Sequence, residues 1–259
     1  MAHVITIANN KGGCGKTTTA TNVAAAIAKS GYKVLAIDAD GQANLTACLG
    51  VTASTGSGTT YDALKQQNAP YIEPVRIFPY IESGGILDLL PAVADLSAVE
   101  AGLVTEPDRL TRFSSVVNGY RDKYDYIIID TPPAVGMLTI SALLASDQVI
   151  ITTQPQILAV KGLVTLSNTI NTLNENGAKI TKQTVVFTQY DKRKKLHRLT
   201  AEQIEAAGFK TYSTRIRDNV ALGEAPAAGL DIFRYAPYTN GAVDYLQLTK
   251  EILSDNAEI

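Results

Sequence analysis

A glycine-rich segment near the N-terminus constrains the fold of this 259-residue chain more than any other feature. The segment KGGCGKTT, residues 11–18, follows an apolar run at His3–Ala8 and leads into Thr17–Lys29, where apolar residues recur at helical spacing. Glycines let backbone N–H groups curl around a phosphate, and the N-terminus of the helix adds its positive end. A strand, this loop and a helix, in that order, predict a nucleotide-binding loop in an α/β protein.

The side chains of this phosphate loop (residues 11–18) suggest which groups contact a nucleotide. Lys16 can reach the β- and γ-phosphates, and the Thr17 hydroxyl can bind Mg²⁺. The usual pattern has a glycine at the position of Asn10, and this chain adds Lys11. A glycine-rich turn that binds nothing is the alternative, and the flanking strand and helix argue against it. We expect contacts to the nucleotide from Lys11, Gly12, Gly13, Cys14, Gly15, Lys16, Thr17 and Thr18.

Apolar, β-branched runs alternate with helical stretches along the rest of the chain. Runs of consecutive apolar residues are typical of strands that helices cover on both faces. The alternation predicts a doubly wound, mainly parallel sheet with helices on both faces, and a ligand site at the carboxyl ends of the strands. No linker divides the chain, so we expect one domain over residues 1–259, with a surface loop at Thr52–Thr60. The further expected strands are Lys33–Ile37, Tyr124–Ile129, Gln148–Thr153 and Thr184–Thr188.

Two carboxylates follow predicted strands and should lie near the phosphate loop. Asp130 ends one strand, and Asp40 comes shortly after another. At the carboxyl edge of the sheet both side chains would face the bound phosphates. The sequence therefore predicts a Mg²⁺ site formed by Thr17, Asp40 and Asp130, while Asp38 either shares a task or is a buried structural acid.

Several segments together resemble the ParA/MinD family of deviant Walker A P-loop ATPases, and in particular the short, Soj-like ParA partition ATPases. The phosphate loop has the lysine ahead of its glycines, and residues 38–44, DADGQAN, match the motif DxDPQxN with Gly41 in place of proline. Residues 127–133, IIIDTPP, resemble the Walker B strand. Residues 216–220, IRDNV, followed by Glu224-Ala225-Pro226, resemble the segment that contacts the purine. With Gly41, the loop after residue 40 is expected to be more mobile.

The resemblance implies hydrolysis of ATP to ADP and phosphate, with Mg²⁺ and with slow basal turnover. It implies that Lys11 reaches the phosphates of a partner in a nucleotide-dependent homodimer, that Asp40 orients the attacking water, and that Arg217, Asp218 and Asn219 contact the purine. A lysine at a loop tip is otherwise usually just solvated. The chain begins just before its first strand, so we expect no N-terminal helix-turn-helix extension.

The net charge of −2 hides a basic segment. Residues 179–217 hold ten Lys and Arg residues against three acids, whereas the remainder holds 13 basic and 22 acidic residues. Such a segment is often only a solvated face, but the resemblance implies non-specific binding to DNA phosphates. Arg193 matches a family arginine, while a second one is Ala221 here. The expected DNA contacts are Lys192, Arg193, Lys194, Lys195, Arg198 and Arg215.

Other features exclude competing classes. The two cysteines, Cys14 as a loop spacer and Cys48 as a core residue, give no disulfide framework and no metal or iron–sulfur site of the nitrogenase iron protein kind. The tyrosines are scattered, unlike the C-terminal cluster of bacterial tyrosine kinases.

The chain has no signal peptide and no apolar run of about 18 residues, and an acidic tail follows its last predicted helix, Val243–Leu253. We therefore expect no membrane partner and a cytoplasmic, nucleoid-associated DNA partition ATPase with a ParB-like adaptor. The alternative is a MinD-like positioning ATPase that acts on a protein or membrane partner.

Overall fold

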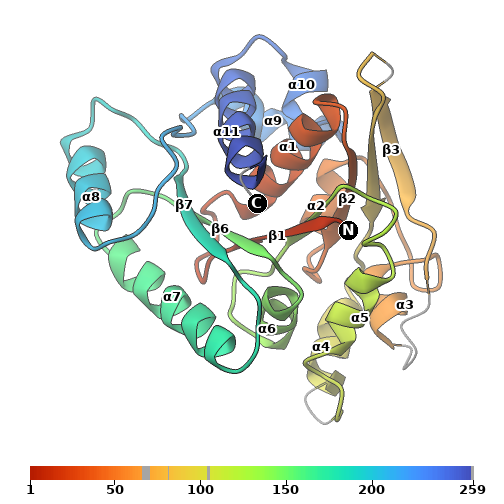
Figure 1. The fold of residues 1–259 in the computed structure, drawn as a ribbon. Helices are drawn as coiled ribbons and strands as arrows, with labels where there is room; N and C mark the ends of the chain where they lie inside the picture. Colours follow the sequence, from red (N-terminus) through yellow and green to blue (C-terminus); the bar gives the residue numbers. More distant parts are fainter. Residues whose placement is uncertain (66–70, 81, 104–105, 258–259) are drawn as a thin grey trace.

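The computed structural model describes residues 1–65, 71–80, 82–103 and 106–257. Its centre is a seven-stranded sheet of order β3-β4-β2-β5-β1-β6-β7, in which β3 is antiparallel to β4 and the other pairs are parallel (Figure 1). The doubly wound, mainly parallel sheet predicted from the sequence is confirmed. The strands are β1 (His3–Ala8), β2 (Lys33–Asp38), β3 (Val75–Tyr80), β4 (Gly85–Leu90), β5 (Tyr126–Asp130), β6 (Gln148–Thr153) and β7 (Lys182–Phe187).

Helices cover both faces of the sheet. Figure 1 shows α1, α9, α10 and α11 on one side and α4, α5, α6 and α7 on the other. The helices are α1 (Lys16–Lys29), α2 (Asn44–Cys48), α3 (Thr60–Lys65), α4 (Leu96–Leu103), α5 (Arg112–Asn118), α6 (Met137–Leu144), α7 (Ala159–Glu175), α8 (Lys195–Ala206), α9 (Val220–Glu224), α10 (Ile232–Tyr235) and α11 (Asn240–Ala257), with a 3₁₀ turn at Ala225–Ala228.

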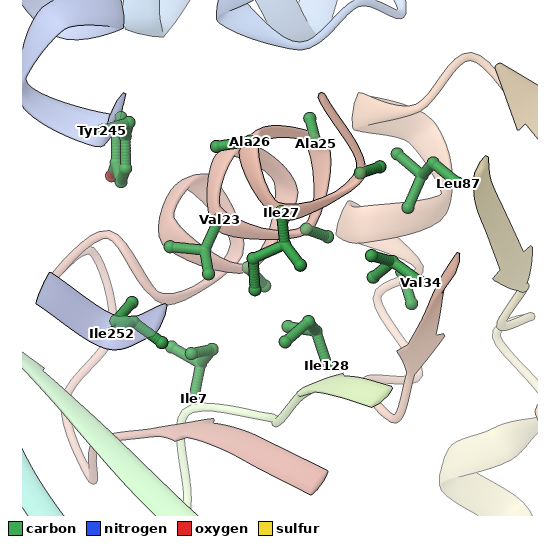
Figure 2. Packing of buried hydrophobic residues seen from close by; sticks show 14 of the residues in the cluster. Ile7, Val23, Ala25, Ala26, Ile27, Val34, Leu87, Ile128, Tyr245 and Ile252 are labelled. Atoms are coloured by element: carbon green, nitrogen blue, oxygen red, sulfur yellow. The ribbon is translucent and has the colours of Figure 1, made fainter. Parts of the chain in front are cut away.

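Alternate residues of the central strands fill two separate cores. In β5, Ile128 packs beneath α1, whereas Ile127 and Ile129 face α5 and α6 on the opposite side. Figure 2 shows Ile128 below Val23 and Ile27 of α1. Burial on both faces explains why this strand is apolar at consecutive positions, and each such isoleucine stabilises the fold by roughly 1.5–3 kcal/mol.

The C-terminal helix α11 is part of the same core. Its Tyr245, Leu248 and Ile252 are buried, and the Tyr245 hydroxyl lies 3.1 Å from Thr19 Oγ1 of α1. The helix is longer at both ends than the predicted Val243–Leu253, and residues 258–259 of the acidic tail lie outside the described part of the chain. A search of the described helices found none with the length and apolar character needed to span a membrane.

The register of the sheet brings the predicted site residues to one edge. Asp130, the last residue of β5, lies beside Ile7 of β1 and beside Asp38, the last residue of β2. The phosphate loop leaves β1 at the same edge and enters α1. The ends of three neighbouring strands therefore meet where the ligand site was predicted.

Candidate functional site

The phosphate loop is shaped by two glycines with positive φ. Gly13 has φ 72° and Gly15 has φ 80°, in the left-handed region that glycine enters without steric cost. Gly15 is also the N-cap of α1. The backbone N–H groups of residues 12–15 donate to no residue that the structure describes. Four successive free donors at a helix N-terminus are suited to an anion.

Two cavities adjoin this loop and share Gly15, Thr18 and Gln189. The first, the loop cavity, has a volume of about 360 Å³ and is lined by Gly12, Gly13, Gly15, Lys16, Thr17, Thr18, Asp40, Asn44, Cys48, Pro133 and Gln189. The second, the 216–219 cavity, has about 180 Å³ and is lined by Gly15, Thr18, Thr188, Gln189, Ile216, Arg217, Asp218, Asn219, Leu222, Gly223 and Tyr245. The fold thus brings the predicted purine segment next to the phosphate loop.

The two lysines of the loop differ in their surroundings. Lys16 is buried, lines the loop cavity, and donates from Nζ to the Lys11 carbonyl at 3.0 Å. Lys11 is exposed, is not among the residues that line the cavity, and donates from Nζ to Gln156 Oε1. Within this single chain, the Lys11 ammonium is therefore held outside the loop cavity.

The cysteines do not behave alike. Cys14 is buried, and its Sγ donates to the Lys11 carbonyl at 3.1 Å, consistent with a small spacer inside the loop. Cys48 was expected in the core, but it is only half-buried and lines the loop cavity, because the short helix α2 ends beside the loop. Burial raises the pKa of the Cys48 thiol to about 11, so it is neutral at pH 7.

The three acids have different hydrogen-bond partners. Asp38 is fully buried and accepts from the Asp40 N–H at 3.1 Å, the Thr46 N–H at 2.8 Å and the Thr46 hydroxyl at 2.7 Å. Asp40 lines the loop cavity, and its Oδ1 accepts from the Gln42 N–H at 2.9 Å. Asp130 is fully buried, and its Oδ2 accepts from Thr17 Oγ1 at 2.7 Å. Asp38 is thus tied into the backbone, while Asp40 faces the open space.

Asp130 Oδ1 is a buried oxygen without a hydrogen-bond partner among the described residues. Such an atom costs free energy unless a ligand or water satisfies it. Burial, with the nearby charge of Asp38, raises the pKa of Asp130 well above its usual range, although the hydrogen bond from Thr17 opposes this. A divalent cation close by would stabilise the ionised carboxylate.

The residues at this position fit Mg²⁺. Carboxylate and hydroxyl oxygens are suitable donors, and Mg²⁺ at nucleotide sites takes most of its ligands from phosphates and water. Among the described residues there is no group of three or more His, Cys, Asp or Glu side chains arranged to hold a metal ion alone. Thr17 and Asp130, already in contact, therefore form the protein part of a candidate site.

Gly41 occupies a tight place. It is buried, and an added Cβ would collide with the Ser97 side chain and lie 3.1 Å from the Ser97 nitrogen. The glycine was expected to make its loop more mobile. The structure adds a steric reason for the glycine, the close approach of α4 to the loop after Asp40.

The predicted DNA contacts do not form one uniform surface. The basic cluster, Lys192–Lys195 with Arg198, lies at the start of α8 with every side chain exposed. Arg193 is paired with Asp191 at 2.9 Å, and its side chain remains 85% exposed. Arg198 donates to the Lys192 carbonyl at 2.9 Å. The cluster is thus well placed for a large anionic partner.

Arg215 and Arg217 are held by the protein itself. The Arg215 guanidinium lies 4.8 Å from the Phe187 ring centre and 4.9 Å from that of Tyr190, and it is paired with Glu205 at 3.0 Å. Arg217 is paired with Asp244 of α11 at 2.6 Å. A cavity of about 780 Å³ separates these arginines from the cluster; it is lined by Tyr190, Asp191, Lys192, Arg193, Lys194, Ser213, Arg215, Arg217, Asp218 and Asn240.

Functional-site contacts also come from residues that sequence motifs did not indicate. Gln154 and Gln189 contact the Gly13 carbonyl, Gln156 contacts Lys11, and Asp244 holds Arg217. Gln154 and Gln189 each lie one residue or two beyond a strand of the predicted sheet. Polar residues that directly follow the predicted strands were the sequence signal that could have identified these two glutamines.

Comparisons with known proteins identify similar sequences and structures. A family model described as an AAA domain matches residues 2–184. The sporulation initiation inhibitor protein Soj of Bacillus subtilis is 36% identical over 98% of this chain and its own whole length. The chromosome partitioning protein ParA of Caulobacter vibrioides is 37% identical, over 97% of this chain and 94% of its own.

One of the similar solved structures contains bound ligands. The crystal structure of a Mycobacterium smegmatis protein, described as cobyrinic acid a,c-diamide synthase with a bound ATP analogue and magnesium, superposes with a TM-score of 0.83. It is 26% identical and covers 98% of this chain and 94% of its own. Both sequence relatives and this structure match nearly the whole chain.

Proposed function

Since this chain belongs to the family of ParA and Soj partition ATPases, we propose that it uses Mg-ATP to drive a cycle of dimerisation and DNA binding that partitions DNA. The observation that carries this proposal is the loop cavity at the edge of the sheet. Gly12, Gly13 and Gly15 of the phosphate loop, the buried Lys16 and the carboxylate of Asp40 line it, and the 216–219 cavity adjoins it through Gly15, Thr18 and Gln189. The ATP and Mg²⁺ expected from the sequence are its cofactors.

The phosphates of ATP would occupy the loop cavity and the purine the 216–219 cavity. Lys16 Nζ would exchange the Lys11 carbonyl for phosphate oxygens, and the N–H groups of residues 12–15 would donate to the phosphates. Thr17 and Asp130 would hold Mg²⁺, which when bound neutralises charge on the phosphates. Arg217, Asp218 and Asn219 would contact the purine end, with the Arg217 side chain held back by Asp244.

Asp40 is the better candidate to orient the attacking water. It lines the loop cavity, whereas the oxygens of Asp38 are occupied by Thr46 and the Asp40 backbone. A water held by the Asp40 carboxylate would be aligned with the terminal phosphate, and that alignment is the main service a protein gives to phosphoryl transfer. Asp38 then acts as a structural acid that fixes the loop carrying Asp40.

Lys11 acts across the dimer. Its exposed position at the loop tip leaves it free to leave Gln156 and reach the phosphates of a second chain. Two chains facing each other through their loops would each supply the other with a cation, the role of an arginine finger in other NTPases. Hydrolysis removes the terminal phosphate that Lys11 would contact in the second chain, so the dimer separates.

The basic cluster binds DNA phosphates without reading sequence. Its side chains are exposed, and dimerisation places two copies on one duplex. A ParB-like adaptor then stimulates the slow basal hydrolysis and resets the cycle. In the ATP state the dimer lies on the nucleoid, in the cytoplasm, and residues 1–259 work as a single ATPase domain.

The experiment that tests this function compares nucleotide states. With Mg²⁺ and a non-hydrolysable ATP analogue the protein should dimerise by light scattering and bind duplex DNA at low salt, and with ADP it should do neither well. Lys11→Ala should still bind ATP but lose the dimer, because the contact in trans is gone. Wild-type protein that shows no DNA binding with the analogue at low salt would refute the partition function.

A further inference from the structure

Two strand ends hold the phosphate loop through glutamine side chains. Gln154, just after β6, donates from Nε2 to the Gly13 carbonyl at 2.7 Å and to Gln189 Oε1 at 2.8 Å. Gln189, just after β7, donates to the same carbonyl at 3.4 Å. Gln189 has φ 50°, a left-handed conformation that side-chain-bearing residues seldom adopt. The backbone at this point is thus held in an uncommon shape that keeps the amide on the loop.

Pinned carbonyls orient the N–H groups that follow them. In a trans peptide the C=O of one residue and the N–H of the next point in opposite directions. The Gly13 carbonyl is held by Gln154 and Gln189, and the Cys14 carbonyl accepts from Thr188 Oγ1 at 2.8 Å. The N–H groups of Cys14 and Gly15 therefore point away from these three side chains and stay free to donate to a phosphate.

The same chain of amides continues to Lys11. Gln156 donates from its backbone N–H to the Gln154 carbonyl at 2.8 Å and from its side-chain Nε2 to Gln154 Oε1. Its Oε1 accepts from Lys11 Nζ. The position of Lys11 in the single chain is therefore set by Gln156, which is hydrogen-bonded to Gln154, the residue that holds the Gly13 carbonyl.

We propose that Gln154 and Gln156 are positioning residues with separate tasks: Gln154 orients the phosphate loop for nucleotide, and Gln156 restrains Lys11 until a second chain arrives. The inference rests on the proposed function, because a restraint on Lys11 matters only if Lys11 acts in trans. Lys11 must break its bond to Gln156 before it reaches the partner, so this bond opposes dimerisation. The bond is solvent-exposed, which limits its strength.

The test measures ATP affinity by calorimetry and the protein concentration at half-dimerisation by light scattering, with Mg²⁺ and saturating non-hydrolysable ATP analogue. Gln156→Met, which keeps the length of the side chain and removes the amide, should bind ATP within about twofold of wild type and dimerise at roughly threefold lower concentration. Gln154→Met should lose about tenfold in ATP affinity, since the hydrogen bonds from Gln154 to the Gly13 carbonyl of the loop and to Gln189 disappear. Gln247→Met, an exposed site on α11, is the matched control and should change neither value.

The outcomes distinguish a failure of this inference from a failure of the proposed function on which it rests. If wild type dimerises and Gln156→Met dimerises at the same or higher concentration, the restraint on Lys11 is wrong while the partition function stands. If wild type itself does not dimerise with the analogue, the proposed function fails. Unchanged ATP affinity in Gln154→Met overturns its role on the loop. If that variant does not fold by circular dichroism, Gln154→Glu, which keeps the size and loses the donors, answers the same question.

Discussion

Salt dependence of DNA binding gives the sharpest test of the basic cluster. We would replace Arg193, Lys194 and Lys195 by alanine, because all three side chains are exposed at the start of α8. Each phosphate that a protein neutralises adds roughly −0.9 to the slope of log affinity against log salt. With about three contacts from each chain of a dimer, the wild-type slope should lie near −5.

The structure sets how much of this slope the variant should lose. Arg193 already pairs with the carboxylate of Asp191 at 2.9 Å. Because Arg193 would exchange this partner for a DNA phosphate, it should contribute less to the slope than an unpaired cation would. Lys194 and Lys195 form no ion pair with an acid in the described part of the chain, although the charge of Lys194 contributes to lowering the pKa of Asp191. The triple variant should therefore flatten the slope by roughly three to five units. Lys192 and Arg198 remain and should leave a weak residual affinity.

Fluorescence anisotropy of a labelled duplex, with the ATP analogue and Mg²⁺ across roughly 50 to 200 mM salt, measures the slope. The control is Lys29→Ala, Lys33→Ala and Lys250→Ala together, which removes the same charge from exposed sites outside the cluster. This control should shift affinity slightly and keep the slope, and both triple variants should keep basal ATP hydrolysis. Wild-type affinity of the cluster variant throughout the titration would show that DNA binds elsewhere.

Three further predictions concern the ATP site. Lys16→Ala should abolish detectable ATP binding in calorimetry, because Lys16 is the lysine that lines the loop cavity. Asp40→Ala should bind ATP and dimerise but not hydrolyse it, since Thr17 and Asp130 remain to hold Mg²⁺; loss of ATP binding would instead make Asp40 a metal or folding residue. Burial raises the pKa of Asp38 to about 6, so folding favours its protonated form, and this stabilisation is present below about pH 4 and lost as pH rises through 6. Compared with Asp38→Asn in urea unfolding, wild type should lose roughly 3 kcal/mol between pH 4 and pH 7, and a pH-independent difference would contradict the raised pKa.

The strands buried on both faces were the ones that the sequence located best. The bounds of β1 and β6 match the expected His3–Ala8 and Gln148–Thr153, because after its first residue each strand holds only apolar residues and threonines. The start of β5 was placed two residues early, at Tyr124, whose hydroxyl instead donates to Asp88 outside the strand. A tyrosine next to an apolar run looks like part of the strand until its partner is known.

The strands at one edge of the sheet were missed. β3 is largely exposed, and β4 carries Asp88 within an otherwise apolar run. That acid is satisfied by Arg76 of β3 and by Tyr124, contacts that exist only once the two strands and β5 are assembled. A charge inside an apolar run weakens the strand pattern, and nothing local shows that it is paired.

In the candidate site, too, some residues could be predicted from the sequence and others could not. Lys16, Thr17 and Asp130 belong to short motifs, and the positions of such residues follow from the loop and the strand end that carry them. The residues that hold those motifs in place could not be predicted in this way. Gln154 contacts Gly13, more than a hundred residues away in the chain, and Asp244 contacts Arg217, about thirty residues away. Their roles depend on register and helix placement, which the sequence pattern does not specify.

The segment 215–219 shows why these supporting contacts matter for function. A parallel bridge joins Tyr190 to Arg217, and the ion pair with Asp244 fixes Arg217 against α11. Arg217 and Asp218 line both the 216–219 cavity and the cavity beside the basic cluster. One short segment therefore forms a wall of the 216–219 cavity on one side and of the cavity beside the basic cluster on the other. Because Arg217 and Asp218 line both cavities, a shift of these two residues would change the shape of both.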